Sequence, residues 1–377
     1  MNPNFPDIHY LKKRGQQRVP RFAWEYLTGG CNNEVNLKRN TEKIRELTLK
    51  PYYLQPYSDI HTRTTLFGHE YDAPFGICPI GLQGMIWPKA TEILARTAAT
   101  HNIPFILSTV ATASLETVAE ITEGKAWFQL YNPVEDELRT DILRRAEEAG
   151  YEVLVLLSDV PSFGYRSKEI KNGLAIPPRM TLSNILQIVG NPTWAIETLL
   201  AGQPEFKTLK PYIPDGMNLR HLGLFMNKTF SGKLNEEKVK AIRDCWKGKL
   251  VMKGVASLED AETAVRLGVD ALMISNHGGR QLDQGQATIE VLPEIVQAYK
   301  GRVPLLMDSG IRTGPDIANT LASGADFTFL GRTFMYGVAA MGKEGGNQVY
   351  EILHKQLQQI LEQLCCERVT DLPNHLS

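Results

Sequence analysis

The chain has 377 residues, of which 41 are lysine or arginine and 42 are aspartate or glutamate, so its formal net charge is −1. A chain with such balanced charge has no broad basic face, which argues against nucleic acid as a partner. It has no run of about 18 apolar residues and no basic-then-apolar signal at the N-terminus. We therefore expect a cytoplasmic protein, or one held peripherally on the inner face of the membrane.

The cysteines predict neither a disulfide framework nor a metal site. They are Cys31, Cys78, Cys245, Cys365 and Cys366. An odd number without metal-ligand spacing is typical of free thiols in a reducing compartment. We expect no bound metal.

Eight short apolar runs recur along the chain, each with the length of a buried strand. In chain order they are Phe75–Pro79, Phe105–Ser108, Trp127–Leu130, Val153–Leu157, Leu250–Lys253, Ala271–Ser275, Val303–Asp308 and Phe327–Leu330. Most are separated by amphipathic stretches such as Thr91–Ala99, Glu135–Ala149, Leu258–Leu267 and Pro315–Ser323. Because parallel strands need helical crossovers, this α/β alternation predicts a (β/α)8 TIM barrel, although a doubly wound open sheet would alternate similarly. Such barrels often exceed about 250 residues, so we expect one domain over residues 1–377, with a helical segment at its N-terminus.

One segment breaks this rhythm between the fourth and fifth runs. Residues 177–248 are rich in Pro, Asn and Gly, with a helical pattern near Ile185–Leu200. Insertions of this length are usually lids or binding loops. The segment has ten Lys or Arg and six Asp or Glu, so it is net positive. It is either a solvated loop or a surface that docks on an anionic membrane.

A polar string follows the sixth apolar run. It reads Ser275-Asn276-His277-Gly278-Gly279-Arg280-Gln281-Leu282-Asp283. A histidine and an arginine three positions apart, loosened by two glycines at the carboxyl end of a strand, make a plausible acid/base and anion-holding pair. Taken alone, His277 could equally be a structural histidine in a glycine turn.

This string resembles the signature of the FMN-dependent L-2-hydroxy-acid dehydrogenase and oxidase family, which includes glycolate oxidase, mandelate dehydrogenase and flavin L-lactate dehydrogenase. The resemblance extends from about Tyr10 to the C-terminal helix. It implies an FMN-binding barrel that oxidises an L-2-hydroxy acid to a 2-oxo acid. Family members are often homotetramers, which the resemblance also suggests.

A phosphate site is predicted after the last two strands. Asp308-Ser309-Gly310 and Arg312 follow the seventh run, and Gly331-Arg332 follows the eighth. Barrels often bind phosphate there, because glycine lets main-chain N–H groups approach and an arginine fork meets phosphate oxygens in pairs. The phosphate could belong to a substrate, but the resemblance implies that of FMN, with Asp308 on the ribityl hydroxyls.

The resemblance also assigns residues to the flavin ring. Pro79, Ile80 and Gly81 would lie against it, Ser108, Gln129 and Ser275 would hydrogen-bond it, and Lys253 would lie near N1. A lysine ending an apolar strand needs a charge partner, which an anionic reduced flavin would supply. Leu157 stands where the family often has a threonine that contacts the flavin, so one hydrogen bond should be missing.

The chemistry requires a base and a carboxylate clamp. His277 is the candidate base, and Arg280 and Arg166 are the candidate clamp. Asp159 should pair with His277 and favour its imidazolium form. The resemblance implies that Tyr131 and Tyr26 contact the substrate hydroxyl and carboxylate, although either tyrosine could simply be a packing residue.

The electron acceptor is predicted from one residue and from the insertion. Gly81 favours a dehydrogenase, because oxidases of the family tend to have alanine there. The insertion from Ser183 to Gly202 resembles that of flavin L-lactate dehydrogenases. We therefore predict L-lactate or a close analogue as substrate, and a quinone or another carrier as acceptor. The alternatives are a peroxide-releasing oxidase, and an FMN-barrel isomerase or reductase of another substrate.

Overall fold

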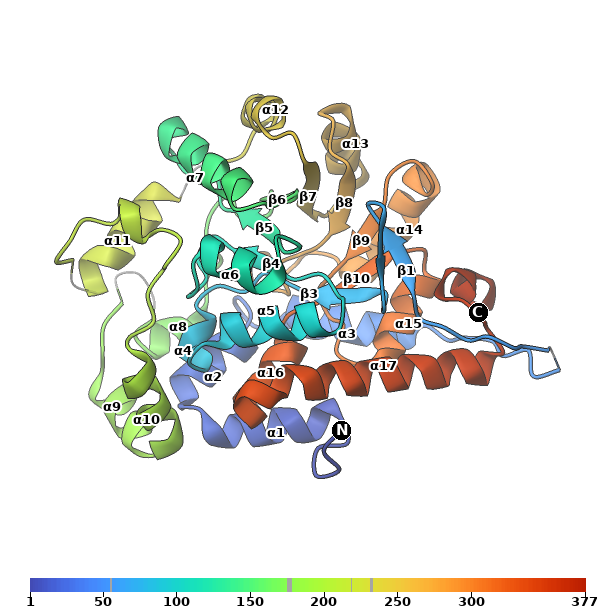
Figure 1. The fold of residues 1–377 in the computed structure, drawn as a ribbon, viewed down its shortest axis with the longest axis horizontal. Helices are drawn as coiled ribbons and strands as arrows, with labels where there is room; N and C mark the ends of the chain where they lie inside the picture. Colours follow the sequence, from blue (N-terminus) through green and yellow to red (C-terminus); the bar gives the residue numbers. More distant parts are fainter. Residues whose placement is uncertain (55, 175–177, 218, 231–232) are drawn as a thin grey trace.

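The protein is described by a computed structural model that covers residues 1–54, 56–174, 178–217, 219–230 and 233–377. Eight parallel strands lie in the order β3-β10-β9-β8-β7-β6-β5-β4, and a bridge between Ile77 and Phe105 closes them into a barrel (Figure 1). The strands are β3 (Phe75–Ile77), β4 (Ile106–Ser108), β5 (Trp127–Leu130), β6 (Val153–Leu157), β7 (Lys249–Val255), β8 (Ala271–Ile274), β9 (Leu305–Met307) and β10 (Phe327–Leu330). The predicted (β/α)8 barrel is confirmed.

The strands are apolar because both of their faces are covered. Alternate residues, such as Ile106 and Val155, belong to a cluster that fills the barrel interior. Their neighbours Leu107 and Leu154 belong to the larger cluster formed with the surrounding helices. This alternation follows from the two-residue period of a strand.

A short hairpin covers the amino-terminal end of the barrel, and the sequence analysis did not predict it. It consists of β1 (Thr64–Leu66) and β2 (His69–Tyr71), which pair antiparallel. Tyr71 packs edge-on against Phe327, the first residue of β10, with ring centroids 5.7 Å apart. Leu66 and Tyr71 join the interior cluster. The hairpin thus fills the end of the barrel opposite to the one that the strand carboxyl ends face.

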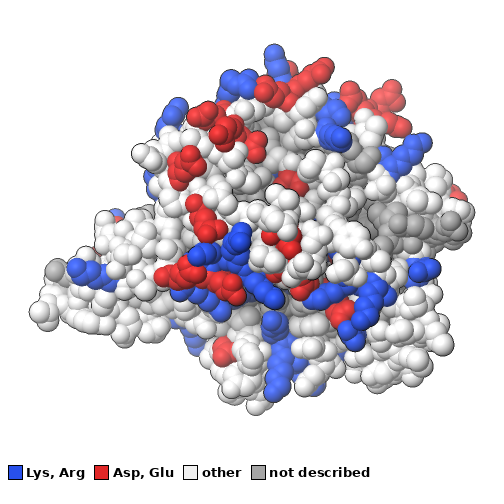
Figure 2. Space-filling view, turned by 180° about the vertical axis from the view of Figure 1, so that it is seen from behind, with Lys and Arg blue, Asp and Glu red and all other residues white. Residues whose placement is uncertain are grey.

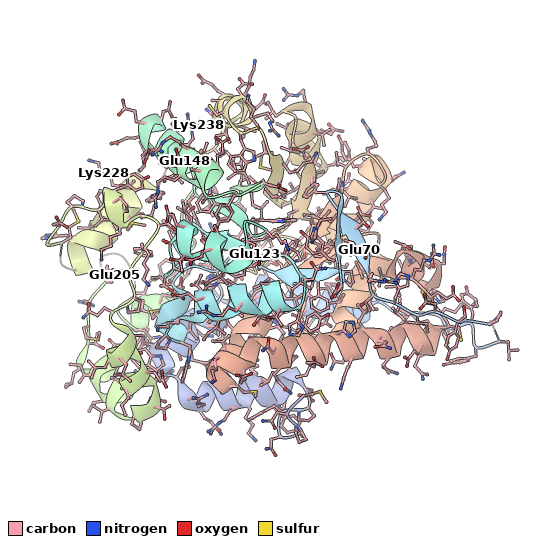
Figure 3. All side chains as sticks on the ribbon, viewed as in Figure 1. Glu70, Glu123, Glu148, Glu205, Lys228 and Lys238 are labelled. Atoms are coloured by element: carbon pink, nitrogen blue, oxygen red, sulfur yellow. The ribbon has the colours of Figure 1, made fainter. Side chains whose placement is uncertain are left out.

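Helices surround the barrel. The ring contains α5 (Ala90–Thr100), α6 (Leu115–Thr122), α7 (Asp136–Glu148), α12 (Glu236–Cys245), α13 (Leu258–Arg266), α14 (Thr288–Tyr299), α15 (Gly314–Ala322) and α16 (Arg332–Met341). Charged side chains such as Glu123 and Glu148 lie on its outer surface (Figure 3). The long helix α17 (Gly345–Leu364) packs its apolar face on α15 and α16, as the helical spacing of its apolar residues predicts.

The N-terminal segment and the insertion add further helices. The N-terminal ones are α1 (Ile8–Arg18), α2 (Arg21–Thr28) and α3 (Val35–Glu46), and α4 (Gln83–Ile86) follows β3. Between β6 and α12 lie α8 (Ser167–Lys171), α9 (Leu182–Val189), α10 (Pro192–Ala201), a 3-10 turn at Lys210–Tyr212, and α11 (Leu219–Thr229). The helical pattern near Ile185–Leu200 is therefore two helices, separated where Gly190 caps α9 and Pro192 begins α10.

Candidate active site

A cavity of about 1320 Å³ lies at the carboxyl ends of the strands, where barrel loops converge. Most of the side chains that the sequence singled out line it together. They are Tyr26, Pro79, Ile80, Gly81, Ser108, Gln129, Tyr131, Arg166, Lys253, His277, Arg280, Asp308, Ser309, Arg312, Gly331 and Arg332. Asp159 and Ser275 lie behind this lining, in contact with His277 and Lys253, and Gly310 continues the β9 turn.

His277 and Asp159 form the pair that the sequence predicted. The imidazole Nδ1 lies 3.2 Å from Asp159 Oδ1. Burial lowers the pKa of His277, although the Asp159 carboxylate acts to raise it. The resting imidazole is therefore neutral at pH 7, while Asp159 acts in the predicted direction by favouring the imidazolium form. A neutral, buried imidazole with a carboxylate behind it is suited to accept a proton.

Gly254 makes room for this pair. Strand β7 shifts register between Lys253 and Val255, and Gly254 has φ +101° at the shift. A Cβ there would lie 2.7 Å from the Cβ of Asp159. Only glycine fits this backbone conformation and this close approach. The sequence analysis did not identify Gly254, because a glycine next to a strand lysine has no separate signal.

Lys253 has its charge partner inside the protein. Its Nζ lies 2.9 Å from Asp308 Oδ2, and it donates to Ser275 Oγ at 2.7 Å. Burial acts to lower the pKa of Lys253, but the carboxylates of Asp308 and Asp159 outweigh it and raise that pKa. Lys253 is therefore a cation that already has a charge partner, Asp308, within the protein.

Cys78 was missed by the sequence analysis. Its buried thiol donates to Asp308 Oδ2 at 3.0 Å. Burial, followed by the charge of Asp308, raises the pKa of this thiol well above its usual value, so it remains protonated. Cys78 directly follows an apolar strand and has no polar neighbour in the sequence, so the sequence does not indicate this contact.

Two arginines crowd the end of the cavity next to α16. The guanidinium of Arg332 donates to the carbonyl oxygens of Leu27, Gly278 and Gly29. Burial, and then the positive charges of Arg312 and Arg280, lower the pKa of Arg332. Gly331 precedes the first turn of α16, whose N–H groups and dipole also favour an anion. A phosphate fits here, because it would relieve the repulsion between the cations.

The middle of the cavity offers donors to a flat polar ring. Ser108 Oγ donates to Gln129 Oε1 at 3.1 Å, and among the described residues nothing accepts a hydrogen bond from the buried Gln129 Nε2. On the other side, a Cβ on Gly81 would lie 2.9 Å from Val110 Cγ2. Leu157 also lines the cavity and presents no hydrogen-bonding group. With the arginine cluster and Lys253, these groups fit FMN.

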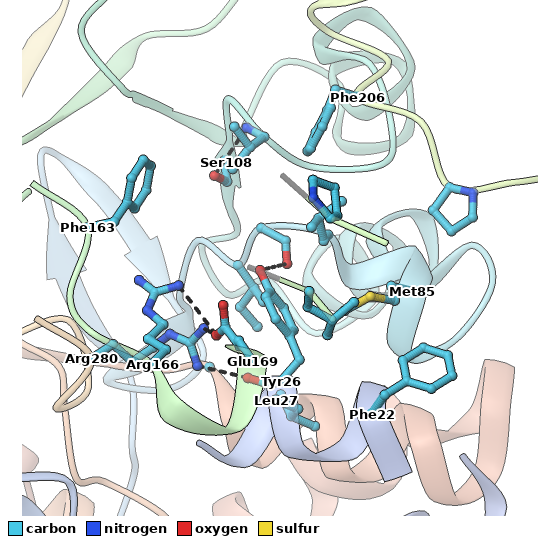
Figure 4. Close-up of a pocket in the computed structure, with 18 of the residues that line it drawn as sticks. Phe22, Tyr26, Leu27, Met85, Ser108, Phe163, Arg166, Glu169, Phe206 and Arg280 are labelled. Carbon is cyan, nitrogen blue, oxygen red and sulfur yellow. Dashed lines mark hydrogen bonds and ion pairs between the residues drawn. The ribbon is translucent and has the colours of Figure 1, made fainter. Parts of the chain in front are cut away.

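The predicted carboxylate clamp already contains a carboxylate. Arg280 Nη2 lies 2.6 Å from Glu169 Oε1, and Arg166 Nη1 lies 3.5 Å from the same atom (Figure 4). Arg280 also stacks on the ring of Tyr26, with its Cζ 5.1 Å from the centroid. Burial raises the pKa of Tyr131 to about 12, so this tyrosine keeps its hydroxyl proton. Glu169 was not predicted, because a glutamate in a short polar helix is usually solvated.

An apolar chamber extends the cavity beneath the insertion. It is lined by Phe22 and Leu27 of α2, Met85 of α4, Trp194 of α10, Phe206, and Met226 and Phe230 of the segment around α11. Figure 4 shows Phe22, Met85 and Phe206 around this part, on the far side of Tyr26 from Phe163. The chamber is therefore continuous with the site of His277 and the arginines.

Comparison with known proteins identifies the family. Residues 15–377 match the family described as FMN-dependent dehydrogenase. The chain is 35% identical to an L-lactate dehydrogenase of Vibrio cholerae serotype O1 (strain ATCC 39315 / El Tor Inaba N16961) over 342 residues, which is 90% of each chain. It is 34% identical to an (S)-mandelate dehydrogenase of Pseudomonas putida over 377 residues, covering 100% of this chain and 95% of the relative.

Solved structures agree with the sequence comparison. The crystal structure of the monotopic membrane protein (S)-mandelate dehydrogenase superimposes with a TM-score of 0.93 at 34% identity, covering 99% of both chains. A mandelate oxidase structure has a TM-score of 0.83 at 28% identity, covering 99% of this chain and 98% of the other. The chain therefore belongs to the FMN-dependent dehydrogenase family, whose cofactor is FMN.

Proposed function

We propose that the protein oxidises L-lactate or a close L-2-hydroxy acid to the 2-oxo acid and passes the electrons to a quinone or another carrier. The observation that carries the proposal is the convergence of the neutral base His277 with the guanidiniums of Arg280 and Arg166 in one cavity. Only a substrate with a carboxylate next to the reacting carbon needs that set. Bound FMN supplies the acceptor for two electrons.

Each side chain has a role in this proposal. Arg280 and Arg166 hold the substrate carboxylate and thereby fix the orientation of the α-carbon. His277 takes a proton from the substrate, and Asp159 stabilises the imidazolium that forms. Tyr26 and Tyr131 contact the carboxylate and hydroxyl, and Tyr131 remains protonated because burial raises its pKa to about 12.

The cofactor would be held by three groups of residues. Arg332, Arg312, Gly331, Ser309 and Gly310 would hold the phosphate, because this end of the cavity concentrates positive charge and main-chain N–H groups. Pro79, Ile80 and Gly81 would lie against the ring, and Ser108, Gln129 and Ser275 would hydrogen-bond it. Lys253 would lie near its N1 pole with Asp308 behind it, and Asp308 would face the ribityl chain.

The insertion would act as a lid over an apolar substrate pocket. Trp194, Phe206 and Phe230 line the chamber from the insertion side. Val110 and the half-exposed Phe163 border the same cavity. This lining supports aliphatic or aromatic 2-hydroxy acids larger than lactate as further substrates, a view favoured by the full-length similarity to an (S)-mandelate dehydrogenase.

Contact with a membrane surface is part of the proposal. Helices α9 and α10 expose apolar side chains to solvent. They are Leu182, Ile185, Leu186, Val189, Ile196, Leu199 and Leu200. In Figure 2 the lower right of the surface, where these helices lie, is largely uncharged. Within the described residues, no helix combines the length and hydrophobicity needed to span a bilayer. Of the two alternatives for the insertion, a solvated loop or a surface that docks on an anionic membrane, these exposed apolar side chains favour a membrane surface that is contacted through apolar groups as well as through charge.

Anaerobic mixing with single 2-hydroxy acids tests the reaction. L-lactate and larger L-2-hydroxy acids should bleach the flavin absorbance, and the D-enantiomers should not. The variant His277→Asn should keep the bound yellow flavin but lose bleaching. An enzyme that is not reduced by any 2-hydroxy acid would instead support an FMN-barrel isomerase or reductase.

Stopped-flow reoxidation in air tests the acceptor. Slow reoxidation by oxygen, together with rapid reoxidation by a soluble quinone, is the expected result. Fast reoxidation with release of hydrogen peroxide would make the protein an oxidase and remove the dehydrogenase assignment that Gly81 favours.

A further inference from the structure

Glu169 occupies the position at which the proposed clamp would receive a substrate carboxylate. Its side chain is 14% exposed, and its Oε1 lies 2.6 Å from Arg280 Nη2 and 3.5 Å from Arg166 Nη1. A carboxylate that meets two guanidiniums in this way has the chemistry of the group that the clamp is built to bind. Figure 4 shows Glu169 pointing toward both arginines beside Tyr26.

Arg280 already makes three hydrogen bonds within the protein. Its Nη1 donates to the carbonyl oxygens of Tyr26 and Gly29, at 2.8 and 3.0 Å. Its Nη2 is held by Glu169. An incoming carboxylate that binds the Nη2 edge of Arg280 therefore competes with Glu169 for it.

Arg166 is less firmly held. Its Nη2 donates to Gln281 Oε1 at 3.1 Å, and among the described residues its buried Nε has no hydrogen-bond partner. An unpartnered guanidinium N–H in a buried cavity is a donor available to a ligand. Arg166 can thus bind an incoming carboxylate first, while Glu169 still neutralises Arg280.

We propose that Glu169 is an internal competitor of the substrate carboxylate, held by Arg280 in the free enzyme and displaced from it when the substrate binds. The inference rests on the proposed function, because it takes Arg280 and Arg166 as the substrate clamp. It makes Glu169 a specificity-determining residue. Small anions that meet only the arginines cannot displace it, whereas a 2-hydroxy acid gains further contacts with His277 and the tyrosines.

The position of Glu169 on α8 allows this exchange. The helix has only five residues, Ser167–Lys171, and none of them is fully buried. The helix is also anchored by Lys168, whose Nζ lies 2.7 Å from Glu34, and by its C-cap Asn172, which donates to Glu25 at 2.7 Å. Release of Glu169 from Arg280 therefore breaks no core packing of the helix, and the Lys168–Glu34 pair keeps α8 in place.

The test is the variant Glu169→Gln in the FMN-loaded enzyme, with pyruvate as the probe of carboxylate binding. The amide cannot compete as an anion, so pyruvate should bind about ten times more tightly by calorimetry, and the KM for L-lactate should fall by a similar factor. The kcat should fall or stay constant, because the 2-oxo acid then leaves more slowly. Unchanged or weaker binding of pyruvate would overturn the proposal.

Glu34→Gln is the matched control. It removes another partly buried carboxylate that anchors α8, and it should leave pyruvate binding unchanged. An equal gain in this variant would assign the effect to loosening of α8 and contradict the role of Glu169.

Glu169→Asp keeps the charge with a shorter side chain and serves if the amide variant does not fold. Because the shorter carboxylate reaches Arg280 less well, it should tighten pyruvate binding by a smaller factor than ten. Weaker binding than in the wild type would overturn the proposal.

Calorimetry separates this proposal from the proposed function. Carboxylate affinity is measured without turnover, so it reports on Glu169 even if no 2-hydroxy acid bleaches the flavin. Bleaching of the wild-type enzyme by L-lactate with no change of affinity in Glu169→Gln would overturn the proposal for Glu169 alone.

Discussion

Lys253 and Asp308 form an ion pair of 2.9 Å in which each side chain is only 5% exposed. Removal of one partner leaves the other charge buried without compensation, which costs about 3–5 kcal/mol in proteins. The variant Asp308→Asn should therefore lower the free energy of unfolding, measured with urea, by an amount in this range. The exposed pair Lys210–Glu205 gives the control, since Glu205→Gln should change it by less than about 1 kcal/mol. Equal losses in the two variants would contradict the interpretation.

The pH profile of the reaction should report the environment of His277. Burial lowers its pKa and Asp159 partly restores it. The neutral imidazole is the active base, so kcat/KM should be constant at neutral pH and fall only as the pH drops through the lowered pKa. Asp159→Asn removes the raising charge, so its acid limb should move to lower pH while the rate falls by about 100-fold or more. A limb that moves to higher pH would contradict this assignment.

The pH dependence of folding stability should also depend on His277. A histidine whose pKa is lower in the folded than in the unfolded chain disfavours the protonated state on folding. Its contribution to stability is present above the unfolded pKa and is lost as the pH falls toward the folded value. His277→Gln should therefore unfold with less dependence on pH between about 5 and 7 than the wild type. Parallel stability curves for the two proteins would exclude this linkage.

The apoprotein should be stabilised by inorganic phosphate. Burial and the charges of Arg312 and Arg280 lower the pKa of Arg332, and an anion at this site relieves the repulsion. Phosphate at about 100 times its Kd should add roughly 2.7 kcal/mol to the free energy of unfolding of FMN-free protein. Arg332→Gln should reduce this gain. Arg302→Gln, on the barrel surface beside Tyr299, is the control and should retain it.

Membrane contact should depend on the exposed leucines of α10. Leu199 and Leu200 are 83% and 80% exposed, and burial of a leucine contributes about 1.5–3 kcal/mol. The double variant Leu199→Ser, Leu200→Ser should lose at least about tenfold in binding to phospholipid vesicles, measured by co-sedimentation. Leu376→Ser, which removes a leucine exposed to 40% elsewhere, should bind as the wild type does. Binding lost in high salt but not in the double variant would point to electrostatic docking instead.

Local pattern was enough to predict the barrel and the polar groups that follow its last strands, whereas most other residues of the cavity lining were predicted from the family resemblance. Each strand is a short apolar run, and the groups that follow β8, β9 and β10 are next to their strands in sequence. Parallel strands bring their carboxyl ends to one face, so side chains such as His277, Asp308 and Arg332 must meet there. Residues that directly follow neighbouring strands in the sequence therefore lie close together in space.

Long-range contacts could not be predicted in the same way. Lys253 and Asp308 lie 55 positions apart, and no pattern in the sequence indicates that the two side chains form an ion pair with each other. Glu169 was overlooked because four of the five residues of its short helix are polar, and its burial depends on Arg280 from a distant loop. The hairpin β1–β2 was overlooked because its strands, Thr64–Leu66 and His69–Tyr71, are short and mostly polar and so form no apolar run.

Because the hairpin fills one end of the barrel, mutations at the two ends should have different effects on stability and specificity. Tyr71 and Leu66 plug the amino-terminal end with hydrocarbon and aromatic rings, far along the strands from the loops that carry the reactive groups. Mutations in the plug should change how well the chain survives heat and leave its choice of acid unaltered. Mutations of the more exposed loop residues at the opposite end, away from the buried Lys253–Asp308 pair, can change the chemistry with less effect on stability, so new specificities can arise there at little structural risk.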